Sequence, residues 1–111
     1  VRDVLTALNT GHDGGWATIH ANGARDVPAR LAALGALAGM GEDAVAAQAA
    51  SAIDAVLHMR RGADGHRWVS EVGVLTRARG PLECAVALSA TADGCVTMHE
   101  AWASLARRVG L

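Results

Sequence analysis

Apolar residues recur at helical spacing in two stretches of the first half of the chain. The first stretch places four apolar residues on one side of a helix: Val27, Leu31, Leu34 and Ala38. The second stretch does the same with Val45, Ala49 and Ile53. Asp26 is a suitable N-cap for the first helix, and Gly39 and Gly41 predict its end. The second helix is expected from Glu42 to about Ala52, with two acidic residues in its first turn.

The second half of the chain alternates with a period of two, which predicts strands. We expect strands over residues 54–60, 67–75, 82–88 and 95–98. Glycine-containing turns at 62–65 and 92–94 predict two hairpins, and Gly80-Pro81 interrupts the chain between them. His58 is expected at a strand surface. A short helix over 100–108 is expected to turn three residues inward: Trp102, Leu105 and Val109.

Glycine, histidine and other polar residues gather in the run of residues 9–22, NTGHDGGWATIHAN. Its apolar part, Trp16 to Ile19, predicts a short buried strand, because it is too short for a helix and follows two glycines. His20 follows at the carboxyl end of this strand, which is where α/β sheets bind their ligands.

Spacing alone leaves several interpretations of this run open. A single histidine near a strand end is more often structural than catalytic, and the glycines can serve a turn only. A zinc site from His12, Asp13 and His20 matches no known zinc spacing and lacks a fourth ligand in sequence. The backbone of the Gly14-Gly15 turn could bind an anion, but only weakly without the rest of a phosphate-binding loop.

The same run closely resembles the histidine box of the secretion ATPase superfamily. These are the hexameric P-loop motors of type II and type IV secretion, type IV pili and tight-adherence pili. The tight-adherence branch, which includes conjugal-transfer-like ATPases, is the most similar. The flanking segments VRDVLTALNTGHDGG and ARDVPARLAAL resemble the helix and turn that follow the family's Walker B motif, and the helix after them. The resemblance is strong over residues 1–39, fair to about Thr76 and weak beyond it.

The resemblance implies an α/β fold, with the C-terminal part of a RecA-like P-loop ATPase domain over residues 1–77. Residues 78–111 would form a C-terminal extension with a hairpin and a short helix. The resemblance assigns a catalytic role near the γ-phosphate to His20 first and to His12 second. It implies a supporting position near the nucleotide for four further residues: Thr18, Asn22, Asp13 and Arg30. Arg25 is expected on a solvated face.

The same resemblance implies the setting of the parent protein. Its cofactors would be ATP and Mg²⁺, and it would assemble as a homo-hexamer. Its partner would be an inner-membrane platform protein of a secretion or pilus system. Its location would be the cytoplasmic face of the inner membrane.

Composition limits what this chain can do by itself. All ten basic residues are Arg, so the chain contains no Walker A loop, whose Lys contacts the phosphates. It also contains no apolar strand that ends in the acidic pair of a Walker B motif. We therefore expect the chain to be the C-terminal part of a longer protein, with no cofactor of its own. A non-catalytic assembly or subunit-interface module is the alternative.

Charge and cysteine content add little further chemistry. The charges of the ten basic residues are balanced by eleven acidic residues. The sequence shows no basic patch, so no nucleic-acid partner is implied. Cys84 and Cys95 match no zinc spacing and are both expected as buried apolar residues in a reducing cytoplasm. No secretory signal or apolar run of membrane-spanning length is found in the sequence.

Overall fold

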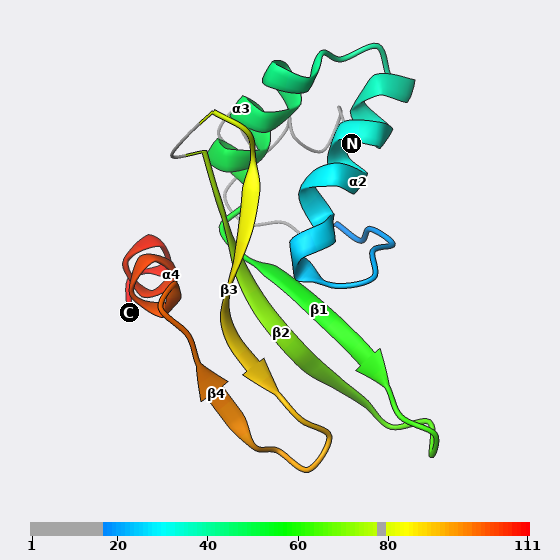
Figure 1. Cartoon of the computed structure of the whole chain (residues 1–111), viewed down its shortest axis with the longest axis vertical. Coiled ribbons are helices and arrows are strands. Elements are labelled where there is room, and N and C mark those ends of the chain that lie inside the picture. The colour runs from blue at the N-terminus through cyan, green and yellow to red at the C-terminus, as the bar shows by residue number, and fades with distance from the viewer. Residues whose placement is uncertain (1–16, 78–79) are drawn as a thin grey trace.

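The computed structural model describes residues 17–77 and 80–111, which form a helical pair, a sheet and a final helix (Figure 1). A short 3₁₀ helix, η1 (Ala24–Asp26), runs directly into α2 (Val27–Leu37), and α3 (Glu42–Ala52) follows. The sheet and the last helix comprise β1 (Val56–Arg61), β2 (Arg67–Thr76), β3 (Glu83–Ala90), β4 (Val96–Met98) and α4 (Trp102–Val109).

The four described strands form an antiparallel meander in the order β1-β2-β3-β4. Mixed helix and sheet agree with the expected α/β class, but the described sheet contains no parallel pair. The predicted strand at Trp16 to Ile19 is wrong over Ala17–Ile19, which is not in a strand. No described strand pairs with this segment, and a strand requires a neighbour for its backbone hydrogen bonds.

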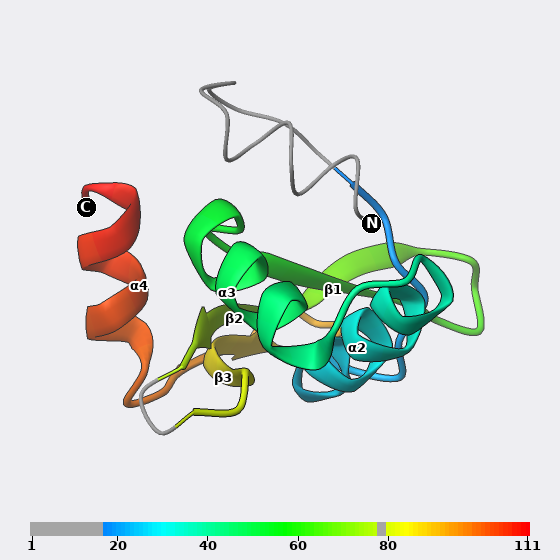
Figure 2. The same cartoon turned by 90° about the horizontal axis from the view of Figure 1, so that it is seen from above.

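Both faces of the sheet are partly covered by helices. Neighbouring residues of β2 point to opposite faces, so they pack into different cores. Leu75 packs into a core with η1, α2 and α3. Val74 packs into a second, smaller core with Ala87 of β3 and Leu105 of α4. We call these sides the α2–α3 face and the α4 face. Figure 2 shows α4 and α2 on opposite sides of the molecule, with α3 between them in this view.

The predicted helices α2 and α3 are confirmed, with their ends close to the expected residues. Gly39 follows α2 with φ of +80°, a left-handed conformation that glycine adopts without strain. Asp26 makes no capping hydrogen bond, because η1 already continues the helical path before α2 begins. Ala38 is exposed rather than inward, since it lies past the last turn of α2.

Two corrections concern residues near the end of the chain. Cys84 is buried as expected, but Cys95 is exposed in the turn before β4. Leu105 is buried, whereas Val109 is exposed because it lies on the last turn of α4. Arg108 fixes this helix against the end of α3, donating to the Asp54 carboxylate at 3.1 Å and the Ser51 carbonyl at 3.0 Å.

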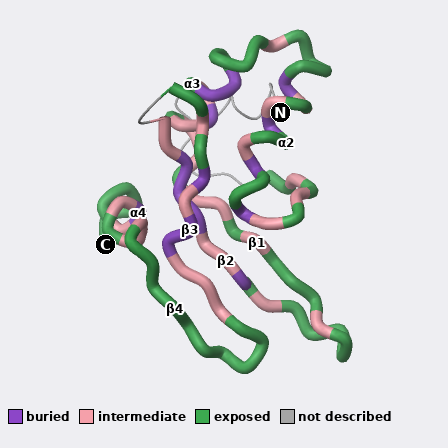
Figure 3. The backbone as a smooth tube through the Cα atoms, viewed as in Figure 1, coloured by how far each residue is buried: buried purple, intermediate pink, exposed green. Residues whose placement is uncertain are grey.

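Burial is concentrated where the sheet meets the helices, and the hairpin ends are exposed (Figure 3). Among residues 17–77 and 80–111, no helix covers either face of the half of the sheet near the β1–β2 hairpin. No helix among the described residues is long and apolar enough to cross a membrane.

Candidate functional site

The described part of the histidine-box segment lies along the surface with alternating burial. Ile19 and Ala21 pack against the core of the α2–α3 face. Thr18, His20 and Asn22, the residues between and after them, are exposed. The three predicted site residues of this segment therefore share the exposed side of the chain. His12 and Asp13 lie outside the described residues.

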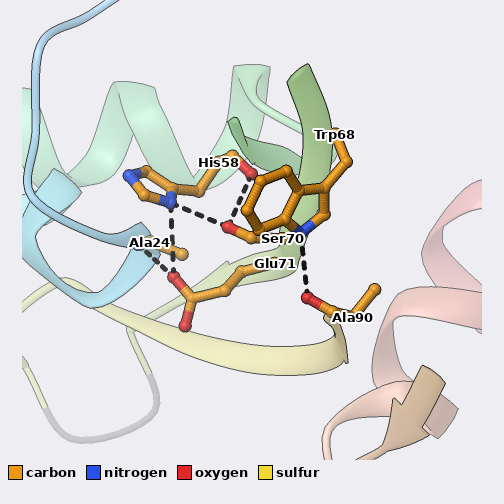
Figure 4. Close-up of polar contacts among 6 residues, drawn as sticks. All are labelled: Ala24, His58, Trp68, Ser70, Glu71 and Ala90. Atoms are coloured by element: carbon orange, nitrogen blue, oxygen red, sulfur yellow. Dashed lines mark hydrogen bonds and ion pairs between the residues drawn. The ribbon is translucent and has the colours of Figure 1, made fainter. Parts of the chain in front are cut away.

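A β-bulge organises the next part of the site. His58 of β1 pairs with Glu71 of β2, whereas Met59 pairs with Val69, so Ser70 is the extra residue of β2. Ser70 and Glu71 both approach the His58 ring: Nδ1 lies 3.1 Å from Ser70 Oγ and 3.8 Å from Glu71 Oε1 (Figure 4). His58 is thus half-buried inside a polar cluster, and its expected position at a strand surface is wrong.

The hydrogen bonds of this cluster determine its chemistry. The Ser70 hydroxyl donates to the His58 carbonyl at 3.1 Å and also lies 3.1 Å from Nδ1 of the His58 ring. In a nucleophilic triad the serine and the acid contact opposite ring nitrogens. Here both approach the same nitrogen, so the cluster braces the sheet and does not activate a serine.

Glu71 connects this cluster to the histidine-box segment. Its Oε1 atom accepts the backbone N–H of Ala24 at 2.9 Å, across 47 residues of sequence. Ala24 is fully buried and opens η1, directly after Asn22 and Gly23. The carboxylate therefore fixes the point at which the exposed Thr18-His20-Asn22 side of the chain meets the sheet.

An open cleft of about 360 Å³ lies next to Glu71 on the α2–α3 face. Its lining includes Asn22, Gly23, Arg25, Arg60, Glu71, Val86, Ser89 and His99. The His99 ring bonds to Ser89 through Nε2, at 2.8 Å from Oγ. Neither Arg25 nor Arg60 forms an ion pair with another described residue. Two guanidinium groups, an imidazole and an amide therefore surround a space in which an anion would find several donors.

The pKa of Cys84 shows that the charges of Glu71 and Arg25 reach this face of the sheet. Burial is the main cause that raises the pKa of the Cys84 thiol to about 11, and the Glu71 carboxylate contributes in the same direction. Arg25 acts in the opposite direction. The thiol is therefore neutral at physiological pH and is a packing residue.

The structure brings together only some of the residues that the sequence predicted. Asn22 lines the cleft, and His20 precedes it by two residues, about 7 Å along an extended chain. Arg30 is exposed on α2 and is not among the lining residues. Arg25 is exposed, as expected, and also lines the open cleft.

Sequence reasoning missed four polar residues of the cleft: Arg60, Glu71, Ser89 and His99. They come from β1, β2, β3 and the residue after β4, so only the sheet brings them together. One signal was available, because Glu71 is the one charged residue within residues 68–75 of β2. Among the described residues, no group of three His, Cys, Asp or Glu side chains could hold a metal ion.

Comparison with known proteins gives a family and two close relatives. The model of the family described as "Type II/IV secretion system protein" matches residues 1–108. Proteins named "Putative conjugal transfer protein" from two Mycobacterium tuberculosis strains, CDC 1551 / Oshkosh and H37Rv, are each 41% identical over 103 residues. The match covers 90% of this chain and 29% of each relative. No solved structure matches the chain.

Proposed function

The chain belongs to the type II/IV secretion system protein family, and from this we propose that it is part of a motor ATPase that couples ATP hydrolysis to pilus assembly, protein export or conjugal transfer. The chain spans 29% of the length of the curated relatives it matches, so the activity is proposed for a longer protein that contains it. The chain would supply the C-terminal part of a RecA-like domain in a homo-hexamer. The hexamer would act on an inner-membrane platform protein, at the cytoplasmic face of the membrane.

One structural observation carries the proposal: an exposed row of polar side chains leads into a cationic cleft. Thr18, His20 and Asn22 share the exposed side of their segment, and Asn22 also lines the cleft with Arg25 and Arg60. Phosphoryl transfer depends mainly on positioned donors and cations, with little covalent chemistry by the protein. This combination of groups fits that requirement.

The residues of the site would have separate roles toward a bound nucleotide. ATP supplies the phosphoryl group, and its Mg²⁺ neutralises part of the phosphate charge. His20 would donate a hydrogen bond to the γ-phosphate, with Thr18 and Asn22 beside it. Arg25 and Arg60 would neutralise phosphate oxygens that enter the cleft. Glu71 would hold the segment in register through the Ala24 N–H.

A subunit-interface role without catalysis is the second candidate. It is favoured by the exposure of Thr18 and His20, neither of which forms a side-chain hydrogen bond with another described residue. In this case the same exposed row would contact a neighbouring subunit, and both box histidines, His12 and His20, would tolerate replacement.

Steady-state ATPase measurements on a full-length protein that contains this chain distinguish the two candidates. We expect His20→Ala to lower kcat by about 10²–10³, the loss seen when one donor to a transition state is removed. Nucleotide affinity should change little, because a contact made only in the transition state affects kcat. His12→Ala should have a smaller effect.

His66→Ala is the matched control, since His66 is exposed in the β1–β2 hairpin and only its backbone is bonded: its N–H donates to Asp64 and its carbonyl accepts from the Gly62 N–H. His58→Ala is unsuitable as a control, because it would disturb the Glu71 cluster. Hydrolysis at the parental rate by the His20→Ala protein would reject the catalytic role and support the interface candidate.

A further inference from the structure

The α4 face of the sheet carries an open row of apolar side chains that crosses all four strands. Paired residues of a sheet point to the same side, and the pairing Leu57–Val72–Leu88–Met98 is continuous across β1, β2, β3 and β4. Val72 packs against the α4 core, which places the whole row on the α4 face. Yet Leu57 is 42% exposed and Met98 is 57% exposed, at the two ends of the row.

A second set of apolar residues extends this surface toward the hairpin ends. Met59 pairs with Val69, and both are exposed on the same side as Leu57. Val96 lies two residues before Met98 on β4 and is also exposed. We call Leu57, Met59, Val69, Val96 and Met98 the open apolar surface. Contiguous exposed apolar residues with a charged rim are typical of interaction sites.

An arginine pair borders the open apolar surface. Arg61 and Arg67 are directly paired across β1 and β2, two residues beyond the Met59–Val69 pair and on the same side. Like charges directly opposite in a sheet destabilise it. Neither arginine forms an ion pair with another described residue. A carboxylate brought between them would relieve the repulsion and form two charge-assisted hydrogen bonds.

The covered half of the same face shows what kind of element fits. There, α4 lays Leu105 and Trp102 over Val74 and Ala87 of the sheet. We propose that the open apolar surface binds an amphipathic, acidic helix of a partner protein, placed on the α4 face beyond α4. Its apolar stripe would cover the four-strand row, and its acidic residues would pair with Arg61 and Arg67. Four strands are about 15 Å across, which a helix of about 14 residues spans.

Charge separates this partner from two other occupants. An anionic membrane surface is recognised by clusters of about four to eight basic residues, whereas this surface is bordered by one arginine pair. A second copy of the chain that contacts this surface with its own open apolar surface would bring apolar side chains but no carboxylate to the arginine pair. An acidic amphipathic helix satisfies both the apolar row and the arginine pair.

Peptide binding to the full chain tests the proposal. The probe is a labelled helical peptide of about 14 residues, with leucines along one stripe and glutamates elsewhere. Its twin has lysine in place of glutamate. We expect saturable binding of the acidic peptide by fluorescence anisotropy and at least about tenfold weaker binding of the twin. Arg61→Glu with Arg67→Glu should reverse this preference, and high salt should reduce it.

Apolar variants complete the test. Leu57→Ser with Met98→Ser should weaken binding of the acidic peptide at least about tenfold. Leu37→Ser is the matched control, because Leu37 is 86% exposed at the end of α2, away from this face. Circular dichroism verifies that each variant is folded. Equal binding of both peptides, or no saturable binding, would overturn the proposal.

Two further outcomes would replace the proposal with another occupant. In the first, the chain binds phosphatidylglycerol vesicles but not the acidic peptide, and the Leu57→Ser, Met98→Ser protein does not bind the vesicles. The surface is then a membrane contact. If light scattering shows a dimer that the same variant abolishes, the surface binds a second copy. Neither outcome depends on ATP hydrolysis, so this test is independent of the proposed function.

Discussion

At the residue scale, Glu71 acts as a helix cap supplied from a distant strand. Gly23 precedes η1 and has no side chain with which to cap the helix. The buried Ala24 N–H therefore needs another acceptor, and Glu71 Oε1 supplies it at 2.9 Å. A carboxylate at this end also complements the helix dipole. A Cβ at position 23 would lie 3.3 Å from the same oxygen, so glycine leaves room for the contact.

Replacing Glu71 should therefore destabilise the start of the helical segment. Glu71→Ala is expected to lower the free energy of unfolding by about 1–3 kcal/mol, because it leaves a buried N–H without its charged acceptor. Glu71→Gln should cost less, since its amide oxygen can still accept. Urea denaturation measures the stability, and hydrogen exchange at the Ala24 amide reports the bond directly. Glu83→Ala, at the exposed start of β3, is the control. Equal losses for Glu71→Ala and Glu83→Ala would contradict the capping role.

At the element scale, α2 and α3 approach each other through small residues. Gly35 of α2 is buried against Val45 of α3, and a Cβ at position 35 would collide with the Val45 side chain. Val45 is only 2% exposed, so it has little room to move away. Ala46 and Ala49 continue the same buried side of α3. The close contact compensates for the scarcity of large aromatic residues in this chain.

This contact predicts an unusual sign for a glycine substitution in a helix. Gly35→Ala would gain about 1 kcal/mol in helix propensity but lose about 1–3 kcal/mol through overpacking against Val45. We expect a net loss of stability in urea denaturation. Adding Val45→Ala should make the effect of Gly35→Ala favourable, because the collision is removed. Gly41→Ala serves as the control, since no atom lies within 4 Å of a Cβ there. A stabilised Gly35→Ala single variant would show that α2 and α3 are not closely packed.

At the scale of the whole molecule, the two faces of the sheet expose different kinds of side chain beyond the parts that the helices cover. The α2–α3 face carries the polar cleft with Arg25 and Arg60, and the α4 face carries the open apolar surface. The strands separate the two, so a ligand in the cleft and a protein on the opposite face could bind at the same time. In a motor, this arrangement would place nucleotide contact and partner contact on one rigid sheet.

The open cleft also limits what the chain can bind by itself. It contains no Lys, so no ammonium group can contact the β- and γ-phosphates as in a P-loop. We expect calorimetric titration of the 111-residue chain with Mg-ATP to show no micromolar binding and no hydrolysis. Inorganic phosphate and ATP should have similarly weak effects, since only the guanidinium groups would attract them. Micromolar affinity for Mg-ATP would contradict this prediction and indicate a complete nucleotide site within the chain.

The sequence by itself determined the local elements and the family. The ranges 27–37 and 42–52, the 62–65 turn and the last helix follow from apolar periodicity, glycine and turn chemistry, which act over a few residues. The match over residues 1–108 agrees with the resemblance seen in the histidine box. Polar and apolar residues also alternate in the sequence from Thr18 to Asn22, and the structure leaves the polar ones exposed while Ile19 and Ala21 pack against the core.

Only the tertiary structure decided the sheet order, the bulge and the cleft. Ala17–Ile19 has the composition of a strand, but a strand forms only where another supplies backbone partners. The sequence predicts His58 at a strand surface, but in the structure its ring lies between Ser70, the extra residue of the bulge, and Glu71. Arg25 and Arg60 are 35 positions apart in sequence, and Glu71 reaches Ala24 across 47 residues. Such contacts depend on how folded elements pack together, and no local pattern in the sequence specifies them.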